Sequence, residues 1–366
     1  MDQDATRPLV VLDLGGVLVD ESNSHARAAA AAAGAYFEDY CVVEQGSRLV
    51  TDERVAQFAA LPGFDAHFRL AFALLYNLMH ALPPSFRPPP SNALRPQEVH
   101  AAFKRKELRY GFLLGLSERN IEEELESIAR HGGGIEGMRR AYRRDSIEGQ
   151  LLYTGEVGAT EREAAAAAAG DKEAVKRLRA IPENLVLRLC EELYLGDVLF
   201  QHVYGVAPLK PRGDGLVGEE TLRIRRDRLE VLASRVDLAL MANRPPALVE
   251  RTLARFGLAD LFRFVLTPVT DEAGVRRGDF IDLQPETFAR LYDLDLAHFG
   301  AQRPPEQIMA VVDTLQDVAA AVAVGLKPVG VVEDRLMRRQ FKELGARTAI
   351  NRLETLVRAF ERQEEP

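Results

Sequence analysis

Residues 8–20 read PLVVLDLGGVLVD and decide the fold of this chain. The apolar first half is typical of a strand that is buried on both faces of a parallel sheet. Asp13 ends this run, and Gly15 and Gly16 follow, where the backbone turns sharply or approaches a ligand closely. Ligands bind at the carboxyl ends of strands in open parallel sheets, so Asp13 is a candidate nucleophile or metal ligand. The alternative is an ordinary strand and turn in which Asp13 serves only as a cap.

Length and composition predict a soluble protein with two structural units. The chain has 366 residues, more than a single core usually holds, and 47% of them are hydrophobic. The net charge of -8 argues against binding to nucleic acid or to an anionic membrane surface. Cys41 and Cys190 form no CxxC pair, which predicts a reducing compartment without a disulfide framework. The acidic N-terminus is unlike a signal peptide, and no apolar run is long enough to span a membrane, so we expect a cytoplasmic protein.

The last third of the chain alternates short apolar runs with helical patterns. The expected strands are 236–242, 262–266, 308–312 and 328–332. Such alternation predicts a doubly wound parallel sheet of the α/β class, which the first strand joins. Residues between these two parts show mostly helical spacing. The sequence therefore predicts a discontinuous α/β core, residues 1–22 and 228–366, with a large inserted α-helical domain, residues 23–227.

Two more aspartates follow the apolar run 308–312. The segment 313–317 reads DTLQD, which places Asp313 and Asp317 at the end of a strand and the start of a helix. With Asp13 they would bring three carboxylates to one edge of the sheet, where they raise one another's pKa values unless a cation lies among them. An all-oxygen site of this kind suits Mg²⁺. The alternative is that Asp313 and Asp317 only cap the helix.

Three motifs in this order resemble those of the haloacid dehalogenase (HAD) superfamily, whose members are mostly phosphohydrolases. Residues 13–20 resemble motif I, and residues 240–245, LMANRP, resemble motif II. Residues 313–317, followed by an alanine-rich helix and Gly325, resemble motif IV. The resemblance implies a HAD-like Rossmannoid core of subfamily I, similar to subfamily IA, with a long helical cap of type C1 between motifs I and II.

The resemblance also implies an active site. Asp13 would attack phosphorus and form an aspartyl-phosphate that water then hydrolyses. The implied ligands of Mg²⁺ are Asp13, a backbone carbonyl of Leu14 or Gly15, Asp313 and Asp317. The substrate would be a small phosphorylated metabolite, over which the cap would close. The residues that would bind its phosphate are Asn243, Arg244 and Gly16.

Three positions depart from the pattern of that superfamily. Gly15 stands where its phosphatases usually carry a second aspartate, a general acid and base whose loss costs about 10²–10⁴ in rate. Ala242 replaces the serine or threonine of motif II, and Asp282 lies where the lysine of motif III is expected. Arg276, Arg277 and Lys327 are basic residues that would replace this lysine if they reach the site, although solvated loops are the simpler interpretation.

These departures leave two hypotheses besides the Mg²⁺-dependent phosphohydrolase. One is a catalytically impaired protein that uses the HAD fold for binding or as a scaffold. The other is a metal-independent hydrolase of the dehalogenase kind, because an Asp13 nucleophile with a non-acidic Gly15 also permits reaction at carbon.

Overall fold

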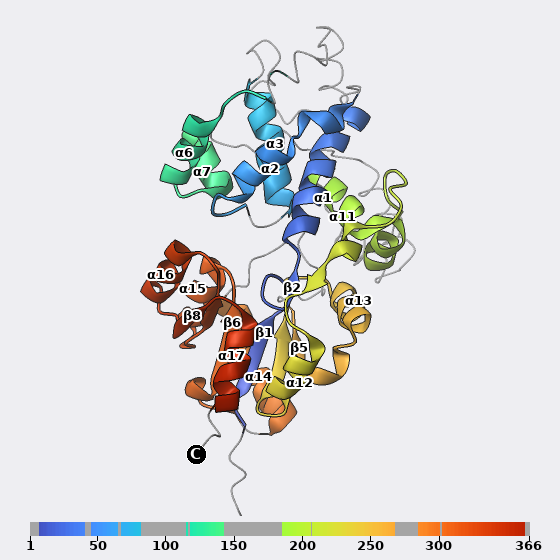
Figure 1. Cartoon of the computed structure of the whole chain (residues 1–366). Helices are drawn as coiled ribbons and strands as arrows, with labels where there is room; N and C mark the ends of the chain where they lie inside the picture. Colours follow the sequence, from blue (N-terminus) through green and yellow to red (C-terminus); the bar gives the residue numbers. More distant parts are fainter. Residues whose placement is uncertain are drawn as a thin grey trace, which may run out of the picture. The chain divides into compact units, whose positions relative to one another are not determined.

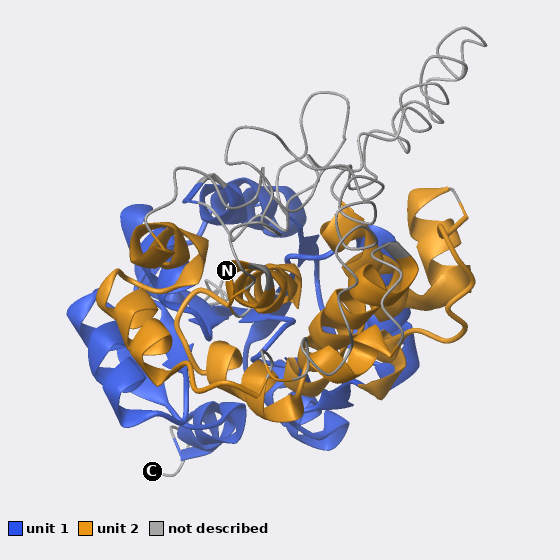
Figure 2. Cartoon of the chain, turned by 90° about the horizontal axis from the view of Figure 1, so that it is seen from above, with its two compact units in different colours: residues 1–21, 220–274, 279–366 blue, residues 22–219, 275–278 orange. Residues whose placement is uncertain are grey.

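The computed structural model describes residues 7–40, 45–64, 67–81, 115, 118–142, 185–205, 207–267, 285–300 and 302–362. The described residues form two compact units (Figure 2). Residues 7–21 and those from 220 onward form unit 1, and those from 22 to 219 form unit 2. The chain thus leaves unit 1 after Glu21 and returns at Glu220, whereas the sequence placed these crossings after residues 22 and 227.

Unit 1 is built on a six-stranded sheet with the order β5-β4-β1-β6-β7-β8 (Figure 1). Every neighbouring pair of strands in it is parallel. The strands are β1 (Leu9–Asp13), β4 (Asp237–Met241), β5 (Val265–Leu266), β6 (Ile308–Val312), β7 (Val329–Val331) and β8 (Thr348–Ile350). The chain proceeds outward from β1 to β4 and β5, and then returns to the other side of β1 with β6. The sheet therefore reverses its direction of growth between β1 and β6, the kind of point at which open α/β sheets bind ligands.

Helices cover both faces of this sheet. Successive side chains of β1 point to opposite faces, and all of them are buried. Val10 and Leu12 belong to one hydrophobic cluster, with residues of α12, α13 and α17. Leu9 and Val11 belong to a second cluster, with residues of α14, α15 and α16. The predicted doubly wound architecture is confirmed. The helices are α12 (Arg226–Ala233), α13 (Pro246–Phe256), α14 (Pro285–Phe299), α15 (Leu315–Ala323), α16 (Arg335–Glu343) and α17 (Leu353–Arg362).

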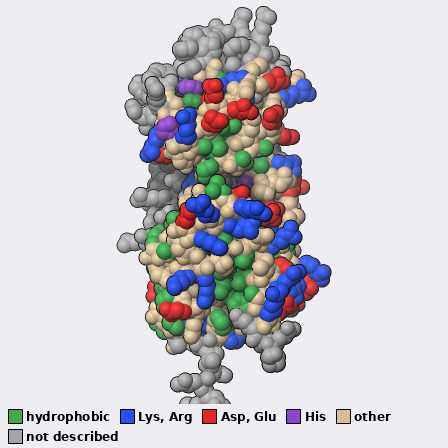
Figure 3. Space-filling view, turned by 60° about the vertical axis from the view of Figure 1, so that its left-hand side comes forward, with side chains coloured by type: hydrophobic (Ala, Val, Ile, Leu, Met, Phe, Trp, Pro, Cys, Tyr) green, Lys and Arg blue, Asp and Glu red, His purple; other side chains and the backbone are tan. Residues whose placement is uncertain are grey.

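Opposite charges lie beside one another on the outer surface of unit 1. The helix α16 carries an exposed ion pair between Arg339 and Glu343, 2.7 Å apart, and α12 carries another between Arg226 and Glu230, 2.8 Å apart. The face drawn in Figure 3 likewise shows basic and acidic side chains interspersed. Such exposed pairs contribute little to stability.

Unit 2 is helical throughout its described residues. Its longer helices are α1 (Ser22–Ala35), α2 (Asp52–Ala59), α3 (His67–Ala81), α6 (Glu122–Arg130), α7 (Gly134–Tyr142) and α11 (Leu185–Tyr204). Most alanines of α1 are buried, and α3 and α11 pack against this helix. Helix α11 kinks at Gly196, whose φ is 73°. Cys190 is buried and unpaired by a disulfide, and Cys41 lies outside the described residues.

A short two-stranded sheet stands where the chain leaves and re-enters unit 1. Strand β2 (Val19–Asp20) pairs antiparallel with β3 (Thr221–Leu222). The register joins Val19 to Leu222 and Asp20 to Thr221, so its continuation brings Glu21 level with Glu220. Within the described part of the chain, no helix has both the length and the apolar character needed to cross a bilayer.

Candidate active site

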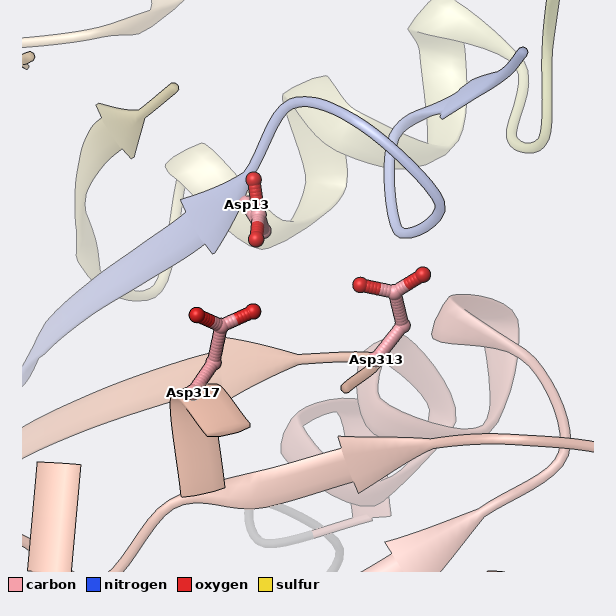
Figure 4. Close-up of side chains that lie close together, drawn as sticks. All are labelled: Asp13, Asp313 and Asp317. Atoms are coloured by element: carbon pink, nitrogen blue, oxygen red, sulfur yellow. The ribbon is translucent and has the colours of Figure 1, made fainter. Parts of the chain in front are cut away.

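Three carboxylates gather at the carboxyl edge of the central strands. Asp13 is the last residue of β1, Asp313 follows β6 directly, and Asp317 lies in the first turn of α15. One oxygen from each lies within 4.8 Å of the others, and both Asp313 and Asp317 point toward Asp13 (Figure 4). Asp13 and Asp317 are buried, while Asp313 is half-buried. The structure thus brings together the three acidic residues that the sequence singled out.

Local structure fixes the direction of two of these side chains. Beyond the last residue of β1, the Leu14 N–H donates to the Met241 carbonyl at 2.8 Å, which holds Asp13 against β4. Thr314 is the N-cap of α15, and its hydroxyl accepts from the Asp317 N–H at 3.1 Å. The same hydroxyl donates to Asp317 Oδ2 at 2.6 Å. One threonine therefore starts the helix and orients the carboxylate.

The electrostatics of this cluster favour a cation. Burial raises the pKa of the Asp13 carboxyl well above its ordinary value of 3.8, and the charges of Asp317, Asp313 and Glu21 raise it further. The backbone hydrogen bond from Leu14 opposes this rise. A bound cation would remove both the repulsion and the cost of desolvation. Because the ligand atoms are all carboxylate oxygens, the group fits a hard divalent ion such as Mg²⁺.

The turn after Asp13 depends on Gly16. Its backbone has a φ of 67°, and its N–H donates to the Val19 carbonyl at 2.9 Å. A Cβ built on Gly16 would lie 1.6 Å from Asp313 Oδ2, so a side chain here would displace that carboxylate. The Gly15 carbonyl accepts from the Val17 N–H at 2.7 Å. Both predicted backbone contacts, from Gly15 to the metal and from Gly16 to phosphate, stay predictions.

Arg244, predicted to bind phosphate, is engaged by two glutamates. Its Nη1 donates to Glu220 Oε2 at 3.0 Å and its Nη2 donates to Glu220 Oε1 at 2.9 Å. The Nη2 atom also donates to Glu21 Oε2. Arg244 and Glu220 are buried, with 6% and 1% of their side chains exposed, whereas Glu21 is 23% exposed. The sequence analysis missed both glutamates, because strands of two residues leave no pattern that pairs them.

The other residues proposed for the phosphate site fall into two groups. Asn243 follows β4 and is half-buried, and the adjacent Ala242 is buried. Lys327 precedes β7, so it lies at the amino edge of the sheet, away from the carboxylates. The suggestion that Lys327 replaces the motif III lysine is therefore wrong. Asp282, Arg276 and Arg277 lie outside the described residues.

Comparison with known proteins rests on structure, since neither a family model nor a curated protein matches the sequence. A structure from the Northeast Structural Genomics Consortium aligns with a TM-score of 0.56 and 15% identity, covering 98% of this chain and 100% of that chain. In this chain the three carboxylates lie where the sheet reverses its direction of growth. Unit 1 has the doubly wound parallel α/β fold that the sequence predicts.

A phosphatase and a hydrolase are also among the similar structures. Phosphatase Tt82 from Thermococcus thioreducens aligns with a TM-score of 0.47 and 16% identity, covering 96% of this chain and 99% of that chain. A haloacid dehalogenase-like hydrolase from Streptococcus pneumoniae aligns with a TM-score of 0.39 and 10% identity, covering 96% and 98%. Both alignments have TM-scores below 0.5.

Proposed function

We propose that this protein is a Mg²⁺-dependent phosphohydrolase that acts on a small phosphorylated metabolite. One observation carries the proposal: Asp13, Asp313 and Asp317 converge within 4.8 Å at the carboxyl edge of a HAD-like sheet. The capping interpretation of Asp313 and Asp317 does not account for this convergence, because Thr314 is the residue that caps α15. An ion held among the three carboxylates would offset their mutual repulsion, and this supports the proposal.

Asp13 is the nucleophile in this proposal. It ends the central strand, and the turn at Gly16 leaves room for Asp313 beside it. Mg²⁺ held by Asp13, Asp313 and Asp317 would supply positive charge that neutralises the phosphate and keeps Asp13 ionised. An oxygen of Asp13 attacks phosphorus, and the bond from phosphorus to the leaving oxygen breaks. Water then hydrolyses the aspartyl-phosphate and releases inorganic phosphate.

The test is hydrolysis of 4-nitrophenyl phosphate by the purified full chain, with Mg²⁺ and with EDTA. We expect turnover only with Mg²⁺, and a decrease in kcat of about 10³-fold or more in Asp13→Asn. Asp227→Asn, at an exposed position on α12, is the matched control and should keep wild-type turnover. Equal turnover by Asp13→Asn and wild type would refute the assignment of the nucleophile. If the wild type shows no turnover while Mg²⁺ still raises its melting temperature, the protein is a binding protein on this fold.

A further inference from the structure

The segment that follows the nucleophile, residues 14–21, is held at both ends by residues at or just beyond the end of β4. Leu14, the first residue of this segment, donates its N–H to the Met241 carbonyl at 2.8 Å. Glu21, the last, accepts a hydrogen bond at its Oε2 from Arg244 Nη2. The first contact is made by the backbone and the second by side chains. The second is therefore the one that depends on the identity of the residues.

Glu21 folds back onto the middle of the same segment. A Cβ built on Gly15 would lie 2.5 Å from Glu21 Oε1, so the carboxylate rests against the Gly15 backbone. The next residue, Gly16, rests in turn against Asp313, because a Cβ built on Gly16 would lie 1.6 Å from Asp313 Oδ2. A displacement of Glu21 would therefore change the packing of the turn, which touches one of the carboxylates of the proposed site.

Glu220 anchors Arg244 from the base of the insertion. It accepts from Arg244 Nη1 at 3.0 Å and from Nη2 at 2.9 Å, and 1% of its side chain is exposed. Its backbone is held as well, since Arg255 Nη2 of α13 donates to the Glu220 carbonyl at 3.0 Å. A planar guanidinium can serve two carboxylates in a fixed geometry, which a lysine ammonium cannot. Arg244 is thus placed to orient Glu21.

We infer that Arg244 and Glu220 are positioning residues of the site, an inference that rests on the proposed function. Glu220 fixes the guanidinium of Arg244, Arg244 fixes the Glu21 carboxylate, and this carboxylate holds the turn that follows Asp13. Neither positioning residue touches the substrate in this role. A misplacement of about 1 Å in reacting groups can cost about 10²-fold in rate, so the pair acts on kcat and leaves the affinity for phosphate unchanged.

The first test is Glu220→Gln, assayed with 4-nitrophenyl phosphate and Mg²⁺ at a temperature where the variant is folded. A glutamine loses one of the two hydrogen bonds to Arg244, so we expect kcat to fall about tenfold or more. The Kd of inorganic phosphate, measured by calorimetric titration, should change by less than about twofold. Glu219→Gln is the matched control, because it removes the same charge from the neighbouring residue, which forms an exposed pair with Arg27. It should keep wild-type kcat.

Arg244→Lys separates a positioning role from phosphate binding. A lysine keeps the positive charge and serves well as a phosphate ligand, but it cannot bind both oxygens of Glu220 and also hold Glu21. We therefore expect its kcat to fall about tenfold or more. Wild-type kcat in Arg244→Lys would overturn the inference. Tighter binding of inorganic phosphate by Glu220→Gln would also overturn it, because Glu220 would then compete with phosphate for the arginine.

Hydrogen exchange tests the positioning of the turn without any hydrolysis. The Gly16 N–H donates to the Val19 carbonyl at 2.9 Å, and the Val19 N–H donates to the Leu14 carbonyl at 2.8 Å. In mass spectrometry of peptides that contain residues 14–19, we expect these amides to exchange about tenfold faster in Glu220→Gln than in the wild type. The amides of β7 should exchange as in the wild type, and Glu219→Gln should change neither region.

The outcomes separate this inference from the proposed function. Faster exchange in Glu220→Gln together with an inactive wild type would refute the phosphohydrolase but not the link between Glu220 and the turn. Unchanged exchange in residues 14–19, or an equal increase in β7, would overturn the inference whether or not the wild type is active. Faster exchange with wild-type kcat would overturn it as well, since the turn would then move without consequence for the reaction.

Discussion

At the scale of single residues, Thr314 decides where the Asp317 carboxylate points. Its hydroxyl bonds both the backbone N–H and Oδ2 of Asp317. We predict that Thr314→Ala destabilises the protein by about 1 kcal/mol, the usual cost of a lost N-cap. Because Asp317 then loses the partner that orients it, we also expect Mg²⁺ to bind about 10- to 100-fold more weakly. Thermal denaturation and calorimetric titration with Mg²⁺ measure the two effects.

Thr314→Ser is the matched control, since a serine hydroxyl forms the same two hydrogen bonds. It should restore most of the stability and the affinity for Mg²⁺. A Thr314→Ala variant that is less stable but binds Mg²⁺ as tightly as the wild type would show that Thr314 caps α15 without orienting the ligand.

The same scale shows how much of the site the sequence could predict. The three aspartates stand at recognisable element ends: Asp13 ends a strand, Asp313 follows one, and Asp317 lies in the first turn of a helix. A parallel sheet brings such positions together, so the sequence could predict the cluster. Glu21 and Glu220 carry no such signal. They lie next to the two residue pairs that join β2 to β3, and strands of two residues leave no recognisable pattern in the sequence. The gap at Gly15 was visible in the sequence, but the side chain that fills it comes from a contact that only the folded chain makes.

At the scale of elements, Arg303 ties β4 and α14 to the beginning of the first strand. Its side chain bonds Asp295 of α14 and Asp237 of β4, and its Nε donates to the Arg7 carbonyl at 2.8 Å. Only 2% of the arginine side chain is exposed, and Asp295 is fully buried. We predict that Arg303→Met destabilises the protein by about 3–5 kcal/mol, because it leaves the buried Asp295 carboxylate without the arginine that neutralises it, whereas Asp237 keeps Arg263 at 3.5 Å. Chemical denaturation measures this loss.

The matched control for Arg303 is Arg339→Met on α16. It removes an arginine from an ion pair with Glu343 in which both side chains are more than half exposed. The expected change in unfolding free energy is below about 0.5 kcal/mol. Similar losses in the two variants would mean that the removal of an arginine, rather than the burial of its partners, causes the destabilisation.

Which elements the sequence predicted depends on how deeply each is buried. Strands β1, β4 and β6 read as apolar runs because both of their faces are covered. Strand β8 was not predicted, since it has three residues and all of them are only half-buried. Helix α16 was missed for a similar reason: it has nine residues, and among them only Phe341 is buried. The expected strand 262–266 is shorter in the structure, where β5 contains Val265–Leu266.

At the scale of the whole molecule, the chain crosses between its two units at adjacent positions. Strands β2 and β3 hold the two crossings side by side, and Glu21 and Glu220 stand directly beyond them. Two negative charges at such a point repel each other unless a cation neutralises them, which Arg244 of unit 1 does. Arg244 therefore ties together, within unit 1, the two points at which the chain leaves this unit and returns to it.

The free energy of unfolding of the whole molecule should depend on the repulsion among its buried carboxylates. In the unfolded chain Asp13 loses its proton near pH 3.8, whereas in the folded chain its pKa is raised. Between these two values the folded state binds more protons than the unfolded state, so stability falls as the pH rises through this interval. At neutral pH without metal, the buried charge of Asp13 therefore opposes folding. We predict that Asp13→Asn raises the melting temperature of the metal-free protein at pH 7 by about 2 °C or more, the shift that about 1 kcal/mol produces in domains of 150–250 residues.

Mg²⁺ and a low pH should each remove the higher melting temperature expected for Asp13→Asn. Saturation with Mg²⁺ stabilises a protein that binds it, by about 2.7 kcal/mol at a hundredfold excess over Kd, and the wild type binds it more tightly than Asp13→Asn because it keeps the third carboxylate. In calorimetric scans the order of melting temperatures should therefore reverse between EDTA and Mg²⁺. The difference in EDTA should also shrink as the pH falls toward 4, since Asp13 becomes neutral. If Asp13→Asn melts below the wild type in EDTA at pH 7, the carboxylates are satisfied by the protein itself, and the physical argument for an ion among them fails.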